Sequence, residues 1–321
     1  MQIDAYRLVE KDIEAMKALS GRTLTDIDPF VDEIVRYSMQ FSGKCLRPAL
    51  LFLVSRIFGP VNEKQLHSAA AIEFIHTATL IHDDILDGAS IRRHLKTVNV
   101  RWNAQVGVLA GDLLLAKALE LMATGGDLFG IQRLTEACCH TCEGELRQVG
   151  GVGDFRMPLE KYLEIIGGKT ASLLACSAEL GAYYSSAGRQ CATLFRQFGH
   201  KIGVAFQMID DILDLTGTAQ AAGKTLRTDL FNRKPTLPVI LYLQQADSKK
   251  RQAMLDKLED EKIDADSIVK ELYESGAVES AKNRAVQEID EALGLIAGIQ
   301  GSQDAKSAIN EIARFVTQRN N

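Results

Sequence analysis

The chain has 321 residues, of which 46% are hydrophobic and 25% charged, and its formal net charge is −5. This composition is typical of a globular protein with one large domain or two small ones, and the acidic balance argues against a nucleic-acid-binding surface. Residues 1–14 are polar and acidic, unlike a signal peptide, so we expect a cytoplasmic protein with reduced thiols. No apolar run reaches the ~18 residues that a membrane span needs, and Asp112 interrupts the best candidate at residues 106–118.

The periodicity of the apolar residues predicts an all-α protein without strong strand segments, organised as a single domain over residues 1–321. Asp28 and Pro29 mark one helix start, as N-cap and first helical residue. Residues 88–98 and 216–234 are expected to be loops. The expected helices cover residues 4–18, 28–39, 47–58, 63–86, 99–124, 127–149, 159–185 and 189–215, followed by shorter amphipathic helices from residue 237.

A cysteine-rich stretch offers one alternative metal site. Cys138, Cys139 and Cys142, with His140, resemble part of a zinc-binding set. A structural zinc site needs a second ligand pair at suitable spacing, and none follows in the sequence. We therefore interpret these residues as small side chains on a buried helix.

Two acidic clusters of identical spacing lie within apolar helical segments. They are Asp83, Asp84 and Asp87, and Asp210, Asp211 and Asp214. On a helix, the first and last aspartate of each cluster lie about 40° apart and repel unless a cation lies between them. Oxygen-only ligands suit Mg²⁺. The alternative, two solvated acidic faces, does not explain why the clusters recur among Leu, Ile and Phe, where unpaired charge is costly.

Cationic and polar groups accompany the acidic clusters. Lys44 and Arg47 stand beside a helix start, where such a pair can hold a phosphate, although surface charge is the default interpretation of that pair alone. His76 lies two helical turns before Asp83 on the same face. The other members of the set are Arg92, Arg93, Lys169, Thr170, Gln207, Lys224 and Lys234. Together with the apolar surroundings, they suit a substrate that has a diphosphate head and a hydrocarbon tail.

At this point the sequence resembles the trans-polyprenyl diphosphate synthases over residues 43–238. The matching motifs are two DDxxD clusters, GKxxRP at residues 43–48, two arginines after the first cluster, Lys169-Thr170, and GxxFQxxDD at residues 203–211. The resemblance implies the isoprenoid synthase fold, a large single-domain helical bundle around a central cavity. It also implies a prenyltransferase of the long-chain type, similar to the octaprenyl diphosphate synthases, that forms a homodimer.

The resemblance also implies a role for each motif residue. Asp83 and Asp87, supported by Asp84, would bind Mg²⁺ that holds the allylic diphosphate, and Asp210, with Asp211 and Asp214 nearby, would bind a further ion, three ions in all. Arg92, Lys169 and Lys224 would contact the allylic diphosphate, and Thr170 and Gln207 would help position the reacting carbons. Lys44, Arg47, His76 and Arg93 would hold isopentenyl diphosphate, and Lys234 would assist in substrate binding.

Three residues depart from the family pattern. Gly88 follows the first cluster where the family usually has a polar or acidic residue. Arg227 and Arg233 stand where it usually has glycine, which puts the role of Lys234 in doubt more than the reaction class.

Small residues before the first acidic cluster predict a long product. Short-chain members of the family have bulky aromatic residues just before this cluster, which close the bottom of the tunnel for the growing hydrocarbon tail. This chain has Ala78 and Thr79 at those positions. Further back along the path the helix presents Ile75 or Phe74, either of which could narrow a tunnel, and then Ala71. A helical turn rises about 5.4 Å, comparable with one isoprene unit, so we expect a product of roughly C30 to C50, about C40, built on farnesyl diphosphate with a transient membrane contact for product release.

Four other interpretations remain. A geranylgeranyl or shorter-chain synthase would share these motifs. A class I terpene cyclase would normally replace the second DDxxD by an Asn/Ser/Glu pattern. A non-catalytic subunit of a heteromeric synthase would typically have lost aspartates or arginines that this chain retains. A purely structural acidic protein would leave the phosphate-binding set unexplained.

Overall fold

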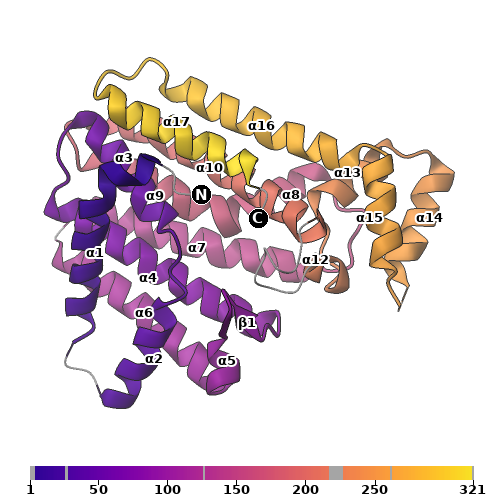
Figure 1. Ribbon diagram of the computed structural model, residues 1–321, viewed down its shortest axis with the longest axis horizontal. Coiled ribbons are helices and arrows are strands. Elements are labelled where there is room, and N and C mark those ends of the chain that lie inside the picture. Colours follow the sequence, from indigo (N-terminus) through magenta and orange to yellow (C-terminus); the bar gives the residue numbers. More distant parts are fainter. Residues whose placement is uncertain (1–3, 26–27, 126, 217–226, 261, 320–321) are drawn as a thin grey trace. The chain divides into compact units, whose positions relative to one another are not determined.

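The computed structural model describes residues 4–25, 28–125, 127–216, 227–260 and 262–319 (Figure 1). Packing divides the chain into two compact units. Unit 1 comprises Met1–Cys138, Leu173–Gly199 and Leu295–Ile312, and unit 2 comprises Cys139–Ser172, His200–Gly294 and Ala313–Asn321. The organisation as one domain over residues 1–321 stays a prediction.

Unit 1 is organised around α4 (Glu63–Leu86), which packs along α6 (Ala104–Thr124) and against α1 (Glu10–Thr23) and α3 (Leu46–Phe58). Figure 1 shows α4 running beside α6 in the early, indigo-to-purple part of the chain. The sequence specifies where α4 begins, because Asn62 forms a capping box at its N-terminus. The helices packed around α4 fix the position of its acidic C-terminal end.

The remaining elements of unit 1 are shorter or only partly within it. They are a 3₁₀-helix η1 (Asp4–Val9), α2 (Pro29–Met39), β1 (Ile91–Arg92), β2 (Leu95–Lys96), α5 (Val98–Arg101), α9 (Ser172–Tyr183), and parts of α7 (Leu128–Gly150), α10 (Gly188–Thr216) and α17 (Gln303–Gln318).

Unit 2 contains the later parts of α7 and α10 and a set of shorter helices. Among these, α13, α14 and α15 pack on one another, and α8 packs on α13. The elements are α8 (Leu159–Ile166), the π-helix η2 (Gly167–Ala171), α12 (Thr228–Phe231), α13 (Leu237–Gln245), α14 (Ser248–Glu259), α15 (Ala265–Glu274) and most of α16 (Ala277–Ile296).

The all-α prediction is confirmed, and the helices expected at 28–39 and 63–86 agree with α2 and α4. Several local predictions were wrong. The cysteine stretch is not buried, because Cys139 and Cys142 are exposed on α7. The loop expected at 216–234 contains the short helix α12. The expected loop at 88–98 contains the antiparallel β1–β2 hairpin. The single helix expected at 99–124 is split into α5 and α6, because the Asn103 side chain accepts a hydrogen bond from Val106 N (2.8 Å) and starts α6 afresh. The helix expected at 159–185 is interrupted by η2.

Within the described ranges, no helix is both long and apolar enough to cross a bilayer.

Candidate active site

The first acidic cluster ends α4, and the structure distinguishes its three aspartates. Asp87 is exposed and Asp83 half-buried. Asp84 is only 1% exposed, accepts a hydrogen bond from Arg92 Nε (2.9 Å) and forms an ion pair with Arg92 Nη2 (2.8 Å). Burial raises the pKa of Asp84, and the Arg92 guanidinium opposes that rise. Asp84 therefore holds Arg92 in place, and its role as a supporting metal ligand stays a prediction.

In the second cluster, Asp211 is the buried centre of a hydrogen-bond network within unit 2. It is 5% exposed and accepts hydrogen bonds from Tyr162 Oη (2.8 Å), Gln207 Nε2 (3.1 Å) and Leu237 N (3.3 Å). The Thr170 hydroxyl in turn donates to Gln207 Oε1 (2.7 Å). Burial, more than any neighbouring charge, raises the pKa of Asp211 to about 7. Hydrogen bonds thus connect the sequence-predicted residues Thr170, Gln207 and Asp211. In this network the Asp211 carboxylate accepts hydrogen bonds that stabilise the fold.

The outer aspartates of the second cluster differ from each other. Asp210 accepts a hydrogen bond from Arg319 Nη1 (2.8 Å), and the Arg319 guanidinium lies over the Phe206 ring at 4.4 Å. Asp214 is buried and accepts a hydrogen bond from Asp229 N (3.1 Å). Asp210 is accordingly the most accessible carboxylate of this cluster, with about a third of its side chain exposed (34%).

Lys169 lies in the π-helical turn η2, a distortion that is frequent at functional sites. Its ammonium contacts Glu145 Oε2 (2.6 Å) and Gln148 Oε1 (2.8 Å). A Cβ added at Gly168 would lie 2.7 Å from a backbone oxygen of α7, and one added at Gly144 would lie 2.3 Å from Lys169 N. Gly168 therefore serves the close packing of η2 on α7.

A basic cluster forms in unit 1 around the hairpin turn. Arg93 (φ 50°) and His94 (φ 64°) occupy its two central positions in the left-handed region, as in a type I′ turn. The Arg93 guanidinium packs on Gly43, where an added Cβ would lie 1.7 Å from Arg93 Nη1. Burial and the nearby Arg47 and Arg93 guanidiniums lower the pKa of His76 well below its usual value, so the imidazole is neutral at physiological pH. The structure therefore brings Gly43, Arg47, His76 and Arg93 together, as the motifs require, with Lys44 exposed beside them.

The segment after the second cluster is described only from residue 227, so Lys224 lies outside the described residues. Lys234 is mostly buried, and its ammonium lies 3.9 Å from Asp229 Oδ1. The backbone reinforces this pairing, since Lys234 N donates to Asp229 O (2.8 Å).

The family departures have a conformational explanation. Arg227 (φ 60°) and Arg233 (φ 53°) both adopt the left-handed conformation that favours glycine and costs other residues roughly 1–2 kcal/mol. Each side chain makes compensating contacts: Arg227 pairs with Asp266, and Arg233 Nη2 donates to Asp260 O (3.2 Å) just beyond α14. Gly88 is also left-handed (φ 63°), as expected of a glycine just past the end of a helix.

The residues expected to control product length all lie on α4. Ala71, Phe74, Ile75 and Ala78 are buried, and Thr79 is half-buried. Ala78 shares a face with His82 and Ile85, whose side chains pack on Gly111 and Gly107 of α6. That face lies about 140° around the helix from Asp83.

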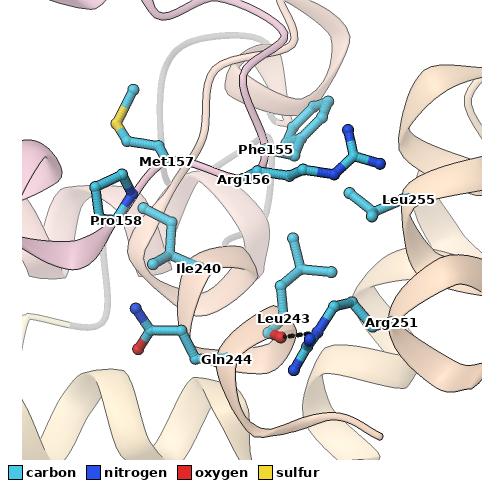
Figure 2. Close-up of a pocket in the computed structure, with 9 residues that line it drawn as sticks. All are labelled: Phe155, Arg156, Met157, Pro158, Ile240, Leu243, Gln244, Arg251 and Leu255. Atoms are coloured by element: carbon cyan, nitrogen blue, oxygen red, sulfur yellow. Dashed lines mark hydrogen bonds between the residues drawn. The ribbon is translucent and has the colours of Figure 1, made fainter. Parts of the chain in front are cut away.

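Figure 2 shows a separate cavity within unit 2, with a volume of about 470 Å³. Its lining is mainly apolar and includes Phe155, Ile240 and Leu243, with Arg251 at one side. Arg251 Nε donates to Leu243 O (2.7 Å) and so helps to end α13. None of the sequence-predicted site residues lines this cavity.

The carboxylates fit magnesium without forming a complete cage. Across the described ranges, no three His, Cys, Asp or Glu side chains converge as a preformed metal site. Mg²⁺ usually binds through one or two carboxylates plus waters and substrate phosphates. Asp83 and Asp87 in unit 1 and Asp210 in unit 2 each have a carboxylate that is partly or fully accessible, and their role as metal ligands stays a prediction.

Sequence reasoning missed two residues that contact the second cluster, and a buried acid, Glu73, one helical turn before His76. Tyr162 and Arg319 contact the second cluster from 49 and 109 positions away, and no local pattern identifies them. Glu73 did have a signal, because it is a lone acid within the apolar stretch at residues 69–75.

An all-α fold with two acidic clusters and a basic cluster is that of an enzyme acting on diphosphate esters. Comparisons with known proteins identify the family: the polyprenyl synthetase family matches residues 28–275. The chain is 31% identical to heptaprenyl diphosphate synthase component 2 of Geobacillus stearothermophilus over 98% of both chains. It is 34% identical to a short chain isoprenyl diphosphate synthase of Methanothermobacter thermautotrophicus, over 92% of this chain and 93% of that one. The crystal structure of a polyprenyl synthase from Caulobacter crescentus, in complex with calcium and isoprenyl diphosphate, superposes with a TM-score of 0.92 at 30% identity, over 100% of this chain and 98% of that one.

The chain therefore belongs to the trans-polyprenyl diphosphate synthase family. It has the isoprenoid synthase fold and is a prenyltransferase, a prenyl diphosphate synthase of a family that is generally magnesium-dependent.

Proposed function

We propose that the chain adds isopentenyl diphosphate repeatedly to an allylic diphosphate such as farnesyl diphosphate. The expected product is roughly C30 to C50, about C40, because one turn of α4 rises about as far as one isoprene unit. One observation carries the proposal. Unit 1 combines accessible carboxylates, Asp83 and Asp87, at the end of α4 with the basic cluster of Arg47, His76 and Arg93. Such a combination suits two diphosphate substrates, one held through metal ions and one by cations alone.

On the allylic side, the aspartates would hold three Mg²⁺ ions, through Asp83 and Asp87 with Asp84 in support and through Asp210 with Asp211 and Asp214 nearby. The ions would supply positive charge that stabilises the departing diphosphate. Arg92 is already fixed by Asp84, so it would add a preorganised charge at little reorganisation cost. Lys169 and Lys224 would contact the same diphosphate.

On the isopentenyl side, Lys44, Arg47 and Arg93 would hold the diphosphate by charge. Neutral His76 would donate one hydrogen bond without adding to the repulsion among the guanidiniums. The allylic C–O bond breaks, the isopentenyl double bond forms the new C–C bond, and a proton leaves to the released diphosphate. Thr170 and Gln207, which hydrogen-bond each other, would help to position the reacting carbons.

The long product is proposed from the absence of an aromatic floor before the first cluster. Ala78 and Thr79, with Ala71 further back along α4, would let the tail pass, whereas Ile75 or Phe74 between them would narrow its path. The relatives include short-chain and heptaprenyl enzymes at similar identity, so the product length rests on these residues alone. Lys234 would assist in substrate binding through its place beside Asp229.

We also propose a homodimer formed through α6. Val108, Leu109 and Leu119 expose apolar surface on this helix, and Leu109 is 67% exposed. These exposed apolar side chains on one helix support the proposed interface. A second candidate is a heteromeric synthase, because one relative is named as component 2 of its enzyme; the purified chain would then be inactive alone.

The test incubates the purified chain with Mg²⁺, labelled isopentenyl diphosphate and farnesyl diphosphate, followed by extraction and sizing of the products. We expect products longer than C20 without any added protein. No incorporation would refute the proposal in favour of the heteromeric alternative. Products of C20 or shorter would refute the product length alone.

A further inference from the structure

Two side chains of α7 hold the ammonium of Lys169, and the sequence motifs give neither of them a role. Glu145 Oε2 lies 2.6 Å from Lys169 Nζ, and Gln148 Oε1 accepts a hydrogen bond from the same nitrogen at 2.8 Å. Glu145 and Gln148 are three positions apart on one helix, so they share a face. The side chains of Glu145 and Lys169 are mostly buried in unit 2, at 19% and 17% exposed. This contact is therefore part of the interior of the unit and differs from the exposed ion pairs that contribute little.

The backbones of α7 and η2 touch beside this contact. A Cβ added at Gly144 would lie 2.3 Å from Lys169 N, and one added at Gly168 would lie 2.7 Å from a backbone oxygen of α7. Hydroxyl groups fasten the same segments, because Ser172 Oγ donates to Gly168 O (2.6 Å) and lies 3.0 Å from Thr141 Oγ1 on α7. The separation of α7 from η2 is thus set by main-chain contact, and the two acceptor side chains project from a fixed base.

Adjacent side chains of η2 contact two different helices. The Lys169 side chain reaches α7, and the Thr170 hydroxyl donates to Gln207 Oε1 of α10 (2.7 Å). A lysine ammonium is a compact charge on a flexible four-carbon chain. Ordering such a side chain when a ligand binds costs free energy, and a side chain that is already ordered avoids that cost. The oxygens of α7 therefore preorganise the Lys169 ammonium before any substrate is bound.

We propose that Glu145 and Gln148 are positioning residues that hold the Lys169 ammonium where it receives the allylic diphosphate. The inference rests on the proposed function, in which Lys169 contacts that diphosphate. Both residues act through Lys169, by means of their acceptor oxygens. The same principle applies in unit 1, where the carboxylate of Asp84 holds Arg92, the other described cation proposed for this diphosphate.

The test compares Glu145→Ala with Glu145→Gln. Both variants lose the carboxylate charge, and only glutamine keeps an oxygen that can accept from Lys169, so the difference between them isolates the positioning effect. Initial rates are measured with farnesyl diphosphate varied at saturating isopentenyl diphosphate and Mg²⁺, and then with the two prenyl substrates exchanged. We expect the KM for farnesyl diphosphate to be about tenfold higher in Glu145→Ala than in Glu145→Gln, which corresponds to one hydrogen bond to a charged group. The KM for isopentenyl diphosphate should be the same in both variants.

Glu143→Ala is the matched control. Glu143 lies on α7 two positions before Glu145, is exposed, and pairs with Arg147 at 3.9 Å. This control also removes one negative charge from α7, and it should keep the parental KM for both substrates.

Three outcomes would overturn the inference: equal KM values for farnesyl diphosphate in Glu145→Ala and Glu145→Gln, an equal rise for both substrates, or an equal rise in the control. If circular dichroism shows that Glu145→Ala does not fold, Gln148→Ala removes the other acceptor without a change of charge. We then expect a severalfold rise of the KM for farnesyl diphosphate over the parent, and a parental value would overturn the inference. A parent protein that is inactive with both substrates would instead refute the proposed function.

Discussion

The sequence motif does not distinguish the three aspartates of the second cluster. The structure predicts that replacing Asp211 lowers the stability of the fold, whereas replacing Asp210 does not. Asp211→Ala removes the acceptor of Tyr162 Oη and Leu237 N, both of which are buried. Each buried donor left without a partner costs about 1–3 kcal/mol, so the variant should lose about 2–6 kcal/mol of stability. Asp210→Ala removes a partly exposed ion pair with Arg319, which is worth about 0–1 kcal/mol.

The assay measures the urea midpoint of unfolding by circular dichroism, together with Mg²⁺-dependent incorporation of isopentenyl diphosphate. Asp210→Ala should unfold near the parental midpoint and lose most activity, whereas Asp211→Ala should unfold at a clearly lower urea concentration. Asp211→Asn is the matched control. The amide oxygen of Asn can still accept from Tyr162, and the Gln207 side chain can rotate to accept from the Asn amide nitrogen. The urea midpoint of this variant should therefore stay close to that of the parent. Equal midpoints for Asp210→Ala and Asp211→Ala would show that the burial argument is wrong.

Four further outcomes are expected. Asp83→Ala should lower turnover by several orders of magnitude with an unchanged melting temperature, whereas Asp84→Ala should lower turnover less and stability more, because it releases Arg92; near-parental turnover in Asp83→Ala would remove the metal assignment. Ala78→Phe should shorten products to about C15 or C20, on the one-turn-per-unit argument, and an unshortened product from a folded variant would contradict the proposed path. Leu109→Glu should convert a dimer to a monomer in analytical ultracentrifugation, and a parent that is already monomeric at micromolar concentration would refute the interface. The carboxyl of Glu73 has a raised pKa in the folded state, so it favours folding at low pH and destabilises the parent as pH rises above about 4.5; the melting temperature of Glu73→Gln relative to the parent should therefore rise with pH.

The Ala78 experiment has a structural complication that the sequence did not reveal. Ala78 lies on the α4 face that packs against α6, where Gly107 and Gly111 allow close approach. Small residues at positions 71 and 78 therefore also serve helix packing. The melting temperature of Ala78→Phe separates the two effects, because a filled tunnel shortens the product without a large loss of stability, whereas a forced helix separation lowers the melting temperature first.

Local signals in the sequence were sufficient for the fold class, for most helix boundaries and for the residue types of the site. The start of α4 follows from the Asn62 capping box and that of α2 from Asp28, which are interactions between residues two or three positions apart. The repeated acidic spacing follows from helix geometry alone, since it needs only the 3.6-residue period. These features involve residues that are neighbours in the chain, and a single sequence records them directly.

Tertiary structure alone decided which of the predicted residues are accessible and what holds them. Asp84 is buried against Arg92, Asp211 accepts from Tyr162, and Arg233 takes a left-handed conformation and donates to Asp260 O just beyond α14. Each of these facts depends on contacts between residues 8 to 49 positions apart, which no helical period or capping rule encodes. Burial and partner choice arise only when the helices pack, because packing removes water from one carboxylate and leaves its neighbour in the same motif exposed.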